Sequence, residues 1–218
     1  MRNFGWKGYI PAVGTEKYSY AKIAQTVSIP DVKYGWSAPQ LDQGNTPTCG
    51  PHSFVELYYT TQMQNSLDPK LLDPFKLAKA YEKYTGEPFS GVYNRVMMAV
   101  AKELYDFKAY HQVNMQKDEI LNCLAEGYAF LVGIPVYENF EDATDGIISM
   151  PSGKFLGGHD ILISGYDWIT YQEPVVFGQN HWANWGYEAP TMVGTCYFRM
   201  PLEYLIKLGQ DAWTITLT

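Results

Sequence analysis

The chain has 218 residues, a length that suits one domain or two small lobes sharing a cleft. Hydrophobic residues make up 46% of it and charged residues 18%, as in globular proteins with a substantial core. The formal net charge of -7 argues against a nucleic-acid-binding surface, which gathers Lys and Arg opposite phosphates. No apolar run is long enough to span a bilayer, and residues 1–14 lack the apolar core of a signal peptide. We therefore expect no export signal and no membrane partner, and a location in the cytoplasm or in a virion fits.

Cysteine usage indicates a reducing compartment. The only cysteines are Cys49, Cys123 and Cys196, and no two of them are close in sequence. This pattern predicts three free thiols rather than a disulfide framework. No CxxC or His-x-x-x-His spacing is present, so we expect neither a metal site nor a bound cofactor.

Residues 1–40 carry scattered Gly, Pro and aromatic residues without a sustained period, and we expect irregular structure there. Residues 41–48 are rich in turn-forming types, and a helix is predicted over residues 49–64. Thr48 can cap this helix, and Pro51 is tolerated in its first turn because the missing N–H would be unpaired there. The predicted packed face of the helix consists of Phe54, Leu57, Tyr58 and Thr61.

The predicted elements that follow are first helices and then strands. Asp73 and Pro74 form a helix start and Gly86 a helix stop, and further helices are predicted over residues 93–105 and 117–126. Short β-rich runs follow at residues 128–137, 158–166, 175–177 and 195–200. Helices first and strands later predict an α+β protein. We divide it into an N-terminal extension (1–35), a helical lobe (36–115) and a β-rich lobe (116–218).

A cysteine at a helix N-terminus can act as a nucleophile because the helix dipole favours the thiolate. Cys49 stands where the turn-rich loop ends and the helix begins. Cys123 falls inside a predicted helix and Cys196 inside a predicted strand, so we interpret these two as structural. From the residues alone, three buried small hydrophobic side chains remain an open alternative.

A thiol nucleophile also needs an imidazole base and a group that orients it. His159 follows two glycines and opens an apolar strand, so it can lean into a cleft. His52, one helical turn after Cys49, is interpreted as a capping or packing residue, and His111 as a surface residue. His181 follows Asn180 in an aromatic cluster, where we expect a packed, hydrogen-bonded role. Spacing alone favours His159 only modestly.

Several motifs in this order resemble the papain family of cysteine peptidases. Residues 41–49 (LDQGNTPTC) resemble the segment in which Gln-Gly precedes the catalytic Cys, with Gln43 six residues before Cys49. Residues 157–167 (GGHDILISGYD) are similar to the Gly-His-Ala-Val-x-x-x-Gly-Tyr block around the catalytic His. Residues 180–186 (NHWANWG) resemble Asn-Ser-Trp-Gly-x-x-Trp-Gly, and residues 132–137 and 146–151 look like bacterial and viral members without a long proregion.

The resemblance implies a papain-like two-lobed fold, with a helical lobe, a β-barrel-like lobe and the active site in the cleft between them. It implies a cysteine endopeptidase acting on a peptide or protein substrate. Cys49 would be the nucleophile and His159 the base, with Asn180 orienting the base. Gln43 and the Cys49 N–H would form the oxyanion hole, and Trp182 would shield the His–Asn bond from water.

The chain departs from the family pattern at several positions. Gly50-Pro-His52 replaces the usual Trp-Ala-Phe, Thr46 replaces a disulfide cysteine, and Asp160 follows the base, where we expect it to point away from the cleft. These changes favour a second hypothesis, a papain-fold structural or binding component of a larger assembly, such as a virion, with little or no turnover. A cell-wall amidase with a Cys/His pair is a third hypothesis, but the families of such amidases lack the Asn-x-Trp block.

The first 35 residues contain large aromatic side chains that need an apolar partner. The segment could lie in the cleft and block Cys49, or pack on the back of the β-rich lobe or against another subunit. We favour packing on the back or against a subunit. The aromatic residues concerned are Phe4, Trp6, Tyr9, Tyr18, Tyr20, Tyr34 and Trp36.

Overall fold

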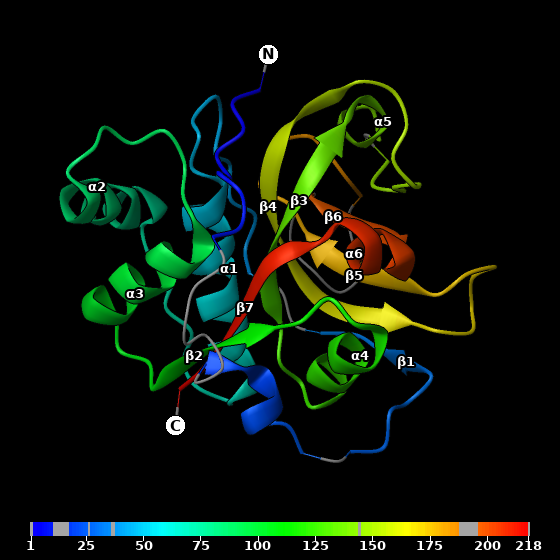
Figure 1. The fold of residues 1–218 in the computed structure, drawn as a ribbon. Coiled ribbons are helices and arrows are strands. Elements are labelled where there is room, and N and C mark those ends of the chain that lie inside the picture. The colour runs from blue at the N-terminus through cyan, green and yellow to red at the C-terminus, as the bar shows by residue number, and fades with distance from the viewer. Residues whose placement is uncertain are drawn as a thin grey trace.

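The computed structural model describes residues 2–10, 18–25, 27–35, 38–143, 145–187 and 196–217 (Figure 1). The helices are α1 (Cys49–Gln64), α2 (Pro74–Thr85), α3 (Asn94–Leu104), α4 (Lys117–Ala125), α5 (Glu138–Glu141) and α6 (Leu202–Leu208), and a 3-10 helix, η2, covers Tyr20–Lys22. The strands are β1 (Val32–Lys33), β2 (Ala109–Val113), β3 (Phe130–Tyr137), β4 (Phe155–Asp167), β5 (Val175–Gln179), β6 (Tyr197–Pro201) and β7 (Gln210–Thr216).

The strands form one antiparallel sheet in the order β2-β7-β3-β4-β5-β6, and β1 pairs with β4 beside this path. Within the described residues the sheet stays open, since β2 and β6 are not paired with each other. The long strand β4 pairs with β3 along most of its length and with β5 toward its end. The fold is therefore α+β, as predicted.

Two hydrophobic cores lie on opposite faces of the sheet. One contains side chains of α1, α2 and α3 together with Leu131, Leu162 and Trp213. The other contains side chains of α4, α5 and α6 together with Val132 and Ile161. Because neighbouring strand residues point to opposite faces, β3 and β4 contribute alternately to the two cores. Figure 1 shows α1, α2 and α3 grouped on one side of β4.

The predicted helices are confirmed to within one or two residues at each end. Helix α1 is buried around most of its circumference rather than along one face, because it packs against β4 as well as against α2 and α3. Strands β2 and β7 were not predicted. Residue 195 lies outside the described residues, and Cys196 precedes β6 with a φ of 80°. In the described part of the chain, no helix is long and apolar enough to cross a membrane.

The aromatic residues of the extension divide between two places. Tyr18 stacks on Tyr110, with ring centroids 4.9 Å apart, and Tyr20 is fully buried in the core that contains α4. This part packs against the sheet, as expected. Phe4 and Trp6 instead lie beside β4 next to the candidate site, so the expectation that they pack on the back of the sheet is wrong. Trp36 lies outside the described residues.

Truncating a side chain in the core should lower the stability of the protein more than truncating an exposed one. Leu162 is fully buried between β4 and α1, so Leu162→Ala should lower the free energy of unfolding by about 2–5 kcal/mol, through lost transfer energy and a residual cavity. Leu67 is 47% exposed, and Leu67→Ala should cost less than about 1 kcal/mol. Urea unfolding monitored by tryptophan fluorescence measures both values. Equal effects of the two substitutions would contradict this description of the core.

Candidate active site

The candidate nucleophile stands at the start of α1. Cys49 is the first residue of the helix, and its side chain has no exposed surface. Thr48 occupies the N-cap position, but its side chain does not cap the helix and lies 2.6 Å from the Thr46 hydroxyl instead. A Cβ on Gly50 would lie 2.3 Å from Val92 Cγ2. Close approach of Val92 therefore explains why a glycine follows Cys49, where the papain family usually has a tryptophan.

The structure brings Asn180 to His159. His159 Nε2 lies 2.9 Å from Asn180 Oδ1, and the backbone N–H of His181 donates to the same oxygen at 2.9 Å. Because this oxygen only accepts, Nε2 must carry the imidazole proton, and Nδ1 is left as the basic nitrogen. The ring of Trp182 lies 4.6 Å from the His159 ring, centroid to centroid, and excludes water from the His–Asn bond.

Gln43 joins the loop before Cys49 to the segment that carries Asn180. Its backbone N–H donates to the His181 carbonyl at 3.0 Å. Its side-chain Nε2 donates to the Thr46 carbonyl at 2.8 Å and to the Asn3 carbonyl at 3.2 Å. The amide of Gln43 thus holds a peptide carbonyl that arrives from the N-terminal extension.

The Cys49 sulfur and the His159 ring do not share a hydrogen bond in this arrangement. His159 Nδ1 is buried and has no hydrogen-bond partner among the described residues. The Cys49 sulfur lies 3.9 Å from Asp160 Oδ2 instead. The hydrogen-bond partner of the sulfur is therefore Asp160 rather than the imidazole.

Asp160 does not point away from the nucleophile, and that expectation is wrong. Alternation along β4 does place His159 and Asp160 on opposite faces of the sheet. The face that Asp160 shares with Leu162 is the one covered by α1, and α1 begins with Cys49. Asn94 Nδ2 donates to Asp160 Oδ1 at 2.5 Å and fixes the carboxyl group. The face of β4 that carries Asp160 therefore borders the nucleophile.

Burial controls the charge states of these groups. It raises the pKa of Asp160 to about 8 and that of nearby Asp211 to about 6. Burial, with the Asp160 carboxyl adding to it, raises the pKa of Cys49 far above its usual range. Burial lowers the pKa of His159 well below its usual range. Cys49 and His159 are therefore a neutral thiol and a neutral imidazole in this state.

Three polar side chains form a buried cluster behind His159. The His181 ring lies 5.0 Å from the His159 ring and 5.4 Å from the His52 ring, between centroids. Glu56 Oε2 is 3.6 Å from His181 Nδ1. Burial raises the pKa of Glu56 and lowers that of His181 to about 3 and that of His52 to about 4. The Glu56–His181 contact is thus a contact between neutral groups rather than an ion pair.

His52 and His181 are buried, as expected for packed residues, but within the described residues the His181 ring makes no hydrogen bond, contrary to expectation. Neither ring takes the place of His159 beside Asn180. Glu56 was not singled out in the sequence, although a carboxylate four residues after His52 on a helix is a signal that could have indicated it. Among the described residues, no group of three or more His, Cys, Asp or Glu side chains is arranged to hold a metal ion.

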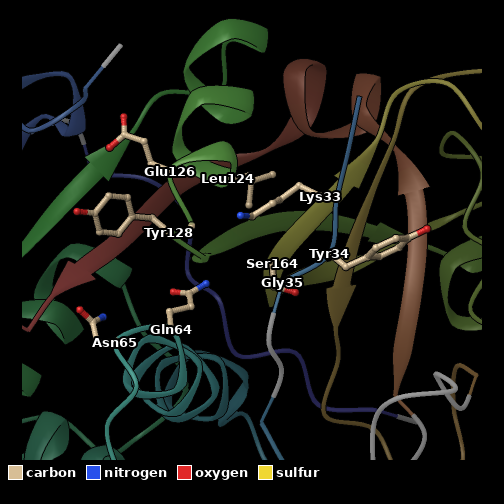
Figure 2. Close-up of a pocket in the computed structure, with 10 residues that line it drawn as sticks. Lys33, Tyr34, Gly35, Gln64, Asn65, Leu124, Glu126, Tyr128 and Ser164 are labelled. Carbon is tan, nitrogen blue, oxygen red and sulfur yellow. The ribbon is translucent and has the colours of Figure 1, made fainter. Parts of the chain in front are cut away.

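A polar cavity of about 320 Å³ opens at the other end of α1 (Figure 2). Gln64 and Asn65 line it from the end of α1, and Lys33, Glu126 and Ser164 come from other segments. None of the four candidate catalytic residues lines this cavity. It is therefore separate from the candidate active site.

Solved structures show what the fold resembles. The chain is similar to the crystal structure of xylellain, a cysteine protease from Xylella fastidiosa, with a TM-score of 0.79 and 19% identity over 100% of this chain and 97% of that one. It is also similar to digestive procathepsin L 3 of the Tenebrio molitor larval midgut (TM-score 0.69, 12% identity, 99% and 76% covered). A third similar structure is procathepsin B S9 from Trypanosoma congolense (TM-score 0.67, 12% identity, 98% and 87% covered).

These likenesses establish the class of the fold. The chain has the papain-like cysteine peptidase fold, as the sequence motifs predicted. No protein-family model matches the sequence, and no curated protein does.

The buried carboxyl of Asp160 predicts a pH-dependent stability. Its pKa is raised from 3.8 to about 8 in the folded protein, so the folded state holds the proton more tightly than the unfolded state. The stabilisation is complete below about pH 4 and is lost as the pH rises through about 8. Asp160→Asn should therefore lose less stability than the wild type between pH 5 and pH 8.5, as measured by urea unfolding.

The matched control is Asp68→Asn, which changes an exposed carboxylate and should leave the pH dependence unchanged. If the free energy of unfolding of Asp160→Asn falls with pH as steeply as that of the wild type, the pKa of Asp160 is not raised in the folded protein.

Proposed function

We propose that this protein is a cysteine peptidase that hydrolyses peptide bonds with Cys49 as nucleophile and His159 as base. Asn180 orients the base, and Gln43 with the Cys49 backbone N–H stabilises the oxyanion. The observation that carries the proposal is the His159–Asn180 hydrogen bond of 2.9 Å beneath Trp182. It leaves Nδ1 of a buried imidazole without a hydrogen-bond partner in the described part of the chain, and this nitrogen can exchange a proton.

The first half of the reaction forms an acyl-enzyme. Proton transfer from the Cys49 sulfur to His159 Nδ1 creates a thiolate and an imidazolium. The thiolate attacks the substrate carbonyl carbon, the C–S bond forms, and the oxygen becomes an oxyanion that accepts from Gln43 Nε2 and the Cys49 N–H. The C–N bond then breaks as His159 Nδ1–H protonates the leaving amine.

The second half releases the acid. Water enters after the amine leaves, and His159 Nδ1 removes one of its protons as the oxygen attacks the thioester carbon. A second oxyanion forms in the same site, the C–S bond breaks, and the carboxylic acid product departs. The Nε2–H···Oδ1 bond to Asn180 persists through both halves, so the ring keeps one tautomer and one orientation.

A structural or binding component without turnover is the competing function. The observation in its favour is the Asp160 carboxyl 3.9 Å from the sulfur, because a carboxylate there disfavours the thiolate. The pairing of His159 with Asn180 favours the peptidase, since a purely structural role does not require an oriented imidazole with a free nitrogen.

A peptidyl inhibitor with a thiol-reactive group tests the proposal. The inhibitor should label the protein stoichiometrically at Cys49 at the end point of the reaction. His159→Ala should slow the labelling by about 10²–10⁴-fold, because the general base is lost. Mass spectrometry of tryptic peptides gives the labelled site and the rate.

His111→Ala is the matched control. His111 lies in β2, far from the candidate site in the sheet order, and its replacement should leave the labelling rate unchanged. Labelling of Cys49 at the same rate in His159→Ala would overturn the assignment of the base.

A further inference from the structure

Two histidines that depart from the papain pattern are neighbours in the interior. His52 stands where the family usually has the phenylalanine of Trp-Ala-Phe, and His181 stands where it has the serine of Asn-Ser-Trp. Their rings lie 5.4 Å apart, between centroids, and both side chains are buried. Glu56 follows His52 by one turn of α1, and its Oε2 lies 3.6 Å from His181 Nδ1. The two departures therefore belong to one feature, which we call the Glu56 cluster (His52, Glu56 and His181).

The backbone of His181 joins two parts of the candidate active site. Its N–H donates to Asn180 Oδ1 at 2.9 Å, and the same oxygen accepts from His159 Nε2. Its carbonyl accepts from the Gln43 N–H at 3.0 Å. A group that fixes residue 181 therefore fixes both the side chain that orients the base and the loop that carries the candidate oxyanion donor.

The side chain of His181 lacks a hydrogen bond that would hold it. Nδ1 and Nε2 are both buried, and neither has a hydrogen-bond partner among the described residues. The ring has the His159 ring at 5.0 Å and the His52 ring at 5.4 Å as neighbours, between centroids. Groups that orient a catalytic side chain are usually held by hydrogen bonds of their own. The open position on Nδ1 therefore calls for a donor.

The Glu56 carboxyl can be that donor. Its side chain has no exposed surface, and neither oxygen has a hydrogen-bond partner in the described part of the chain. Burial raises the pKa of Glu56 well above its ordinary value, so the carboxyl keeps its proton, and a protonated carboxyl donates. Burial lowers the pKa of His181 to about 3, so its ring is neutral and Nδ1 can accept. The separation of 3.6 Å exceeds a hydrogen bond by less than about 1 Å, which a small side-chain rotation removes.

We propose that Glu56 is a positioning residue for the base and acts through His181. The Glu56 O–H donates to His181 Nδ1 and fixes the ring, and the backbone of residue 181 holds Asn180, which orients His159. Glu56 touches no reacting atom. The inference rests on the proposed function, because it assigns a supporting group to the same site. Cys49 and Glu56 lie about two turns apart on α1, so the helix that presents the nucleophile also positions the base.

Two substitutions of similar size separate positioning from packing. Glutamine can donate an N–H to His181 Nδ1, whereas leucine cannot. The readout is the rate at which the peptidyl inhibitor labels Cys49. Glu56→Gln should react within about threefold of the wild-type rate, and Glu56→Leu should react at least about tenfold more slowly, because the base is less well oriented. Equal rates in the two variants, with urea unfolding showing that both are folded, overturn the proposal.

Thr60→Val is the matched control. Thr60 lies one turn beyond Glu56 on the same helix, and its hydroxyl is also buried without a hydrogen-bond partner among the described residues. The substitution removes a buried polar atom from α1 but leaves the Glu56 cluster intact. Its labelling rate should equal that of the wild type. A loss in Thr60→Val as large as that in Glu56→Leu would show a general effect of α1 and overturn the proposal.

A double-mutant cycle tests whether Glu56 acts through His181. His181→Leu removes the acceptor and keeps the backbone N–H and carbonyl. It should slow the labelling of Cys49 at least about tenfold, as Glu56→Leu does. The double variant should react no more slowly than either single variant, because both substitutions remove the same contact. Losses that multiply in the double variant would contradict an action through His181.

Nitrogen-15 NMR of the imidazole rings tests the geometry without turnover. The chain has four histidines, so each ring can be assigned by substitution. In the wild type, His181 should carry its proton on Nε2, with Nδ1 accepting, and a proton on Nδ1 would overturn the proposed donation. In Glu56→Leu, the Nε2–H of His159 should exchange with water at least about tenfold faster than in the wild type. An unchanged exchange rate in the folded variant overturns the proposal.

The two readouts separate failure of this proposal from failure of the proposed function. If the peptidyl inhibitor does not label Cys49 in the wild type, the proposed function fails, whereas faster exchange at His159 in Glu56→Leu still supports positioning. Stoichiometric labelling of the wild type with equal rates in Glu56→Gln and Glu56→Leu supports the peptidase and overturns positioning.

Discussion

The alternation of side chains along β4 is the constraint on which the rest of the structure depends. This strand separates the two hydrophobic cores, and each of its residues must face one or the other. His159 faces the side where Trp182 and Asn180 lie, and Asp160 faces the side where α1 begins. A shift of one residue in the pairing with β3 would exchange these faces and dismantle the site.

The same strand also binds the beginning of the chain beside the base. The Gly158 carbonyl accepts from the Trp6 N–H, and the Phe4 ring lies 6.1 Å from the His159 ring, between centroids. Cys49 and His159 have no exposed surface in this arrangement, and burial favours the neutral form of each group.

Polar groups without partners are concentrated around the base. Asn180 Nδ2, His159 Nδ1 and the Glu56 carboxyl oxygens have no hydrogen-bond partner among the described residues, and each is buried. Such groups destabilise the folded state, and native proteins retain few of them, often at functional sites. The His181 ring lies 5.0 Å from the His159 ring, between centroids, so a positive charge on one imidazole disfavours a charge on the other.

Local sequence determined the helices, and the motifs that resemble the papain family singled out the candidate site. Some residues act directly on the backbone of their own segment and can therefore be interpreted without the tertiary structure. They are the turn residues before Cys49, the Asp73–Pro74 start of α2 and the glycines before His159. Strands β2 and β7 were not predicted because they are short and gain stability from pairing with each other, across a separation of about 100 residues in the chain.

Tertiary structure alone decided that Asp160 faces the nucleophile, because the packing of α1 determines which face of β4 lies against Cys49. Tertiary structure also decided that Trp6 lies over Gly133 rather than on the back of the sheet. Gly133 and Gly158, which leave room for its ring, are distant in the chain, so the sequence around Trp6 could not indicate this contact.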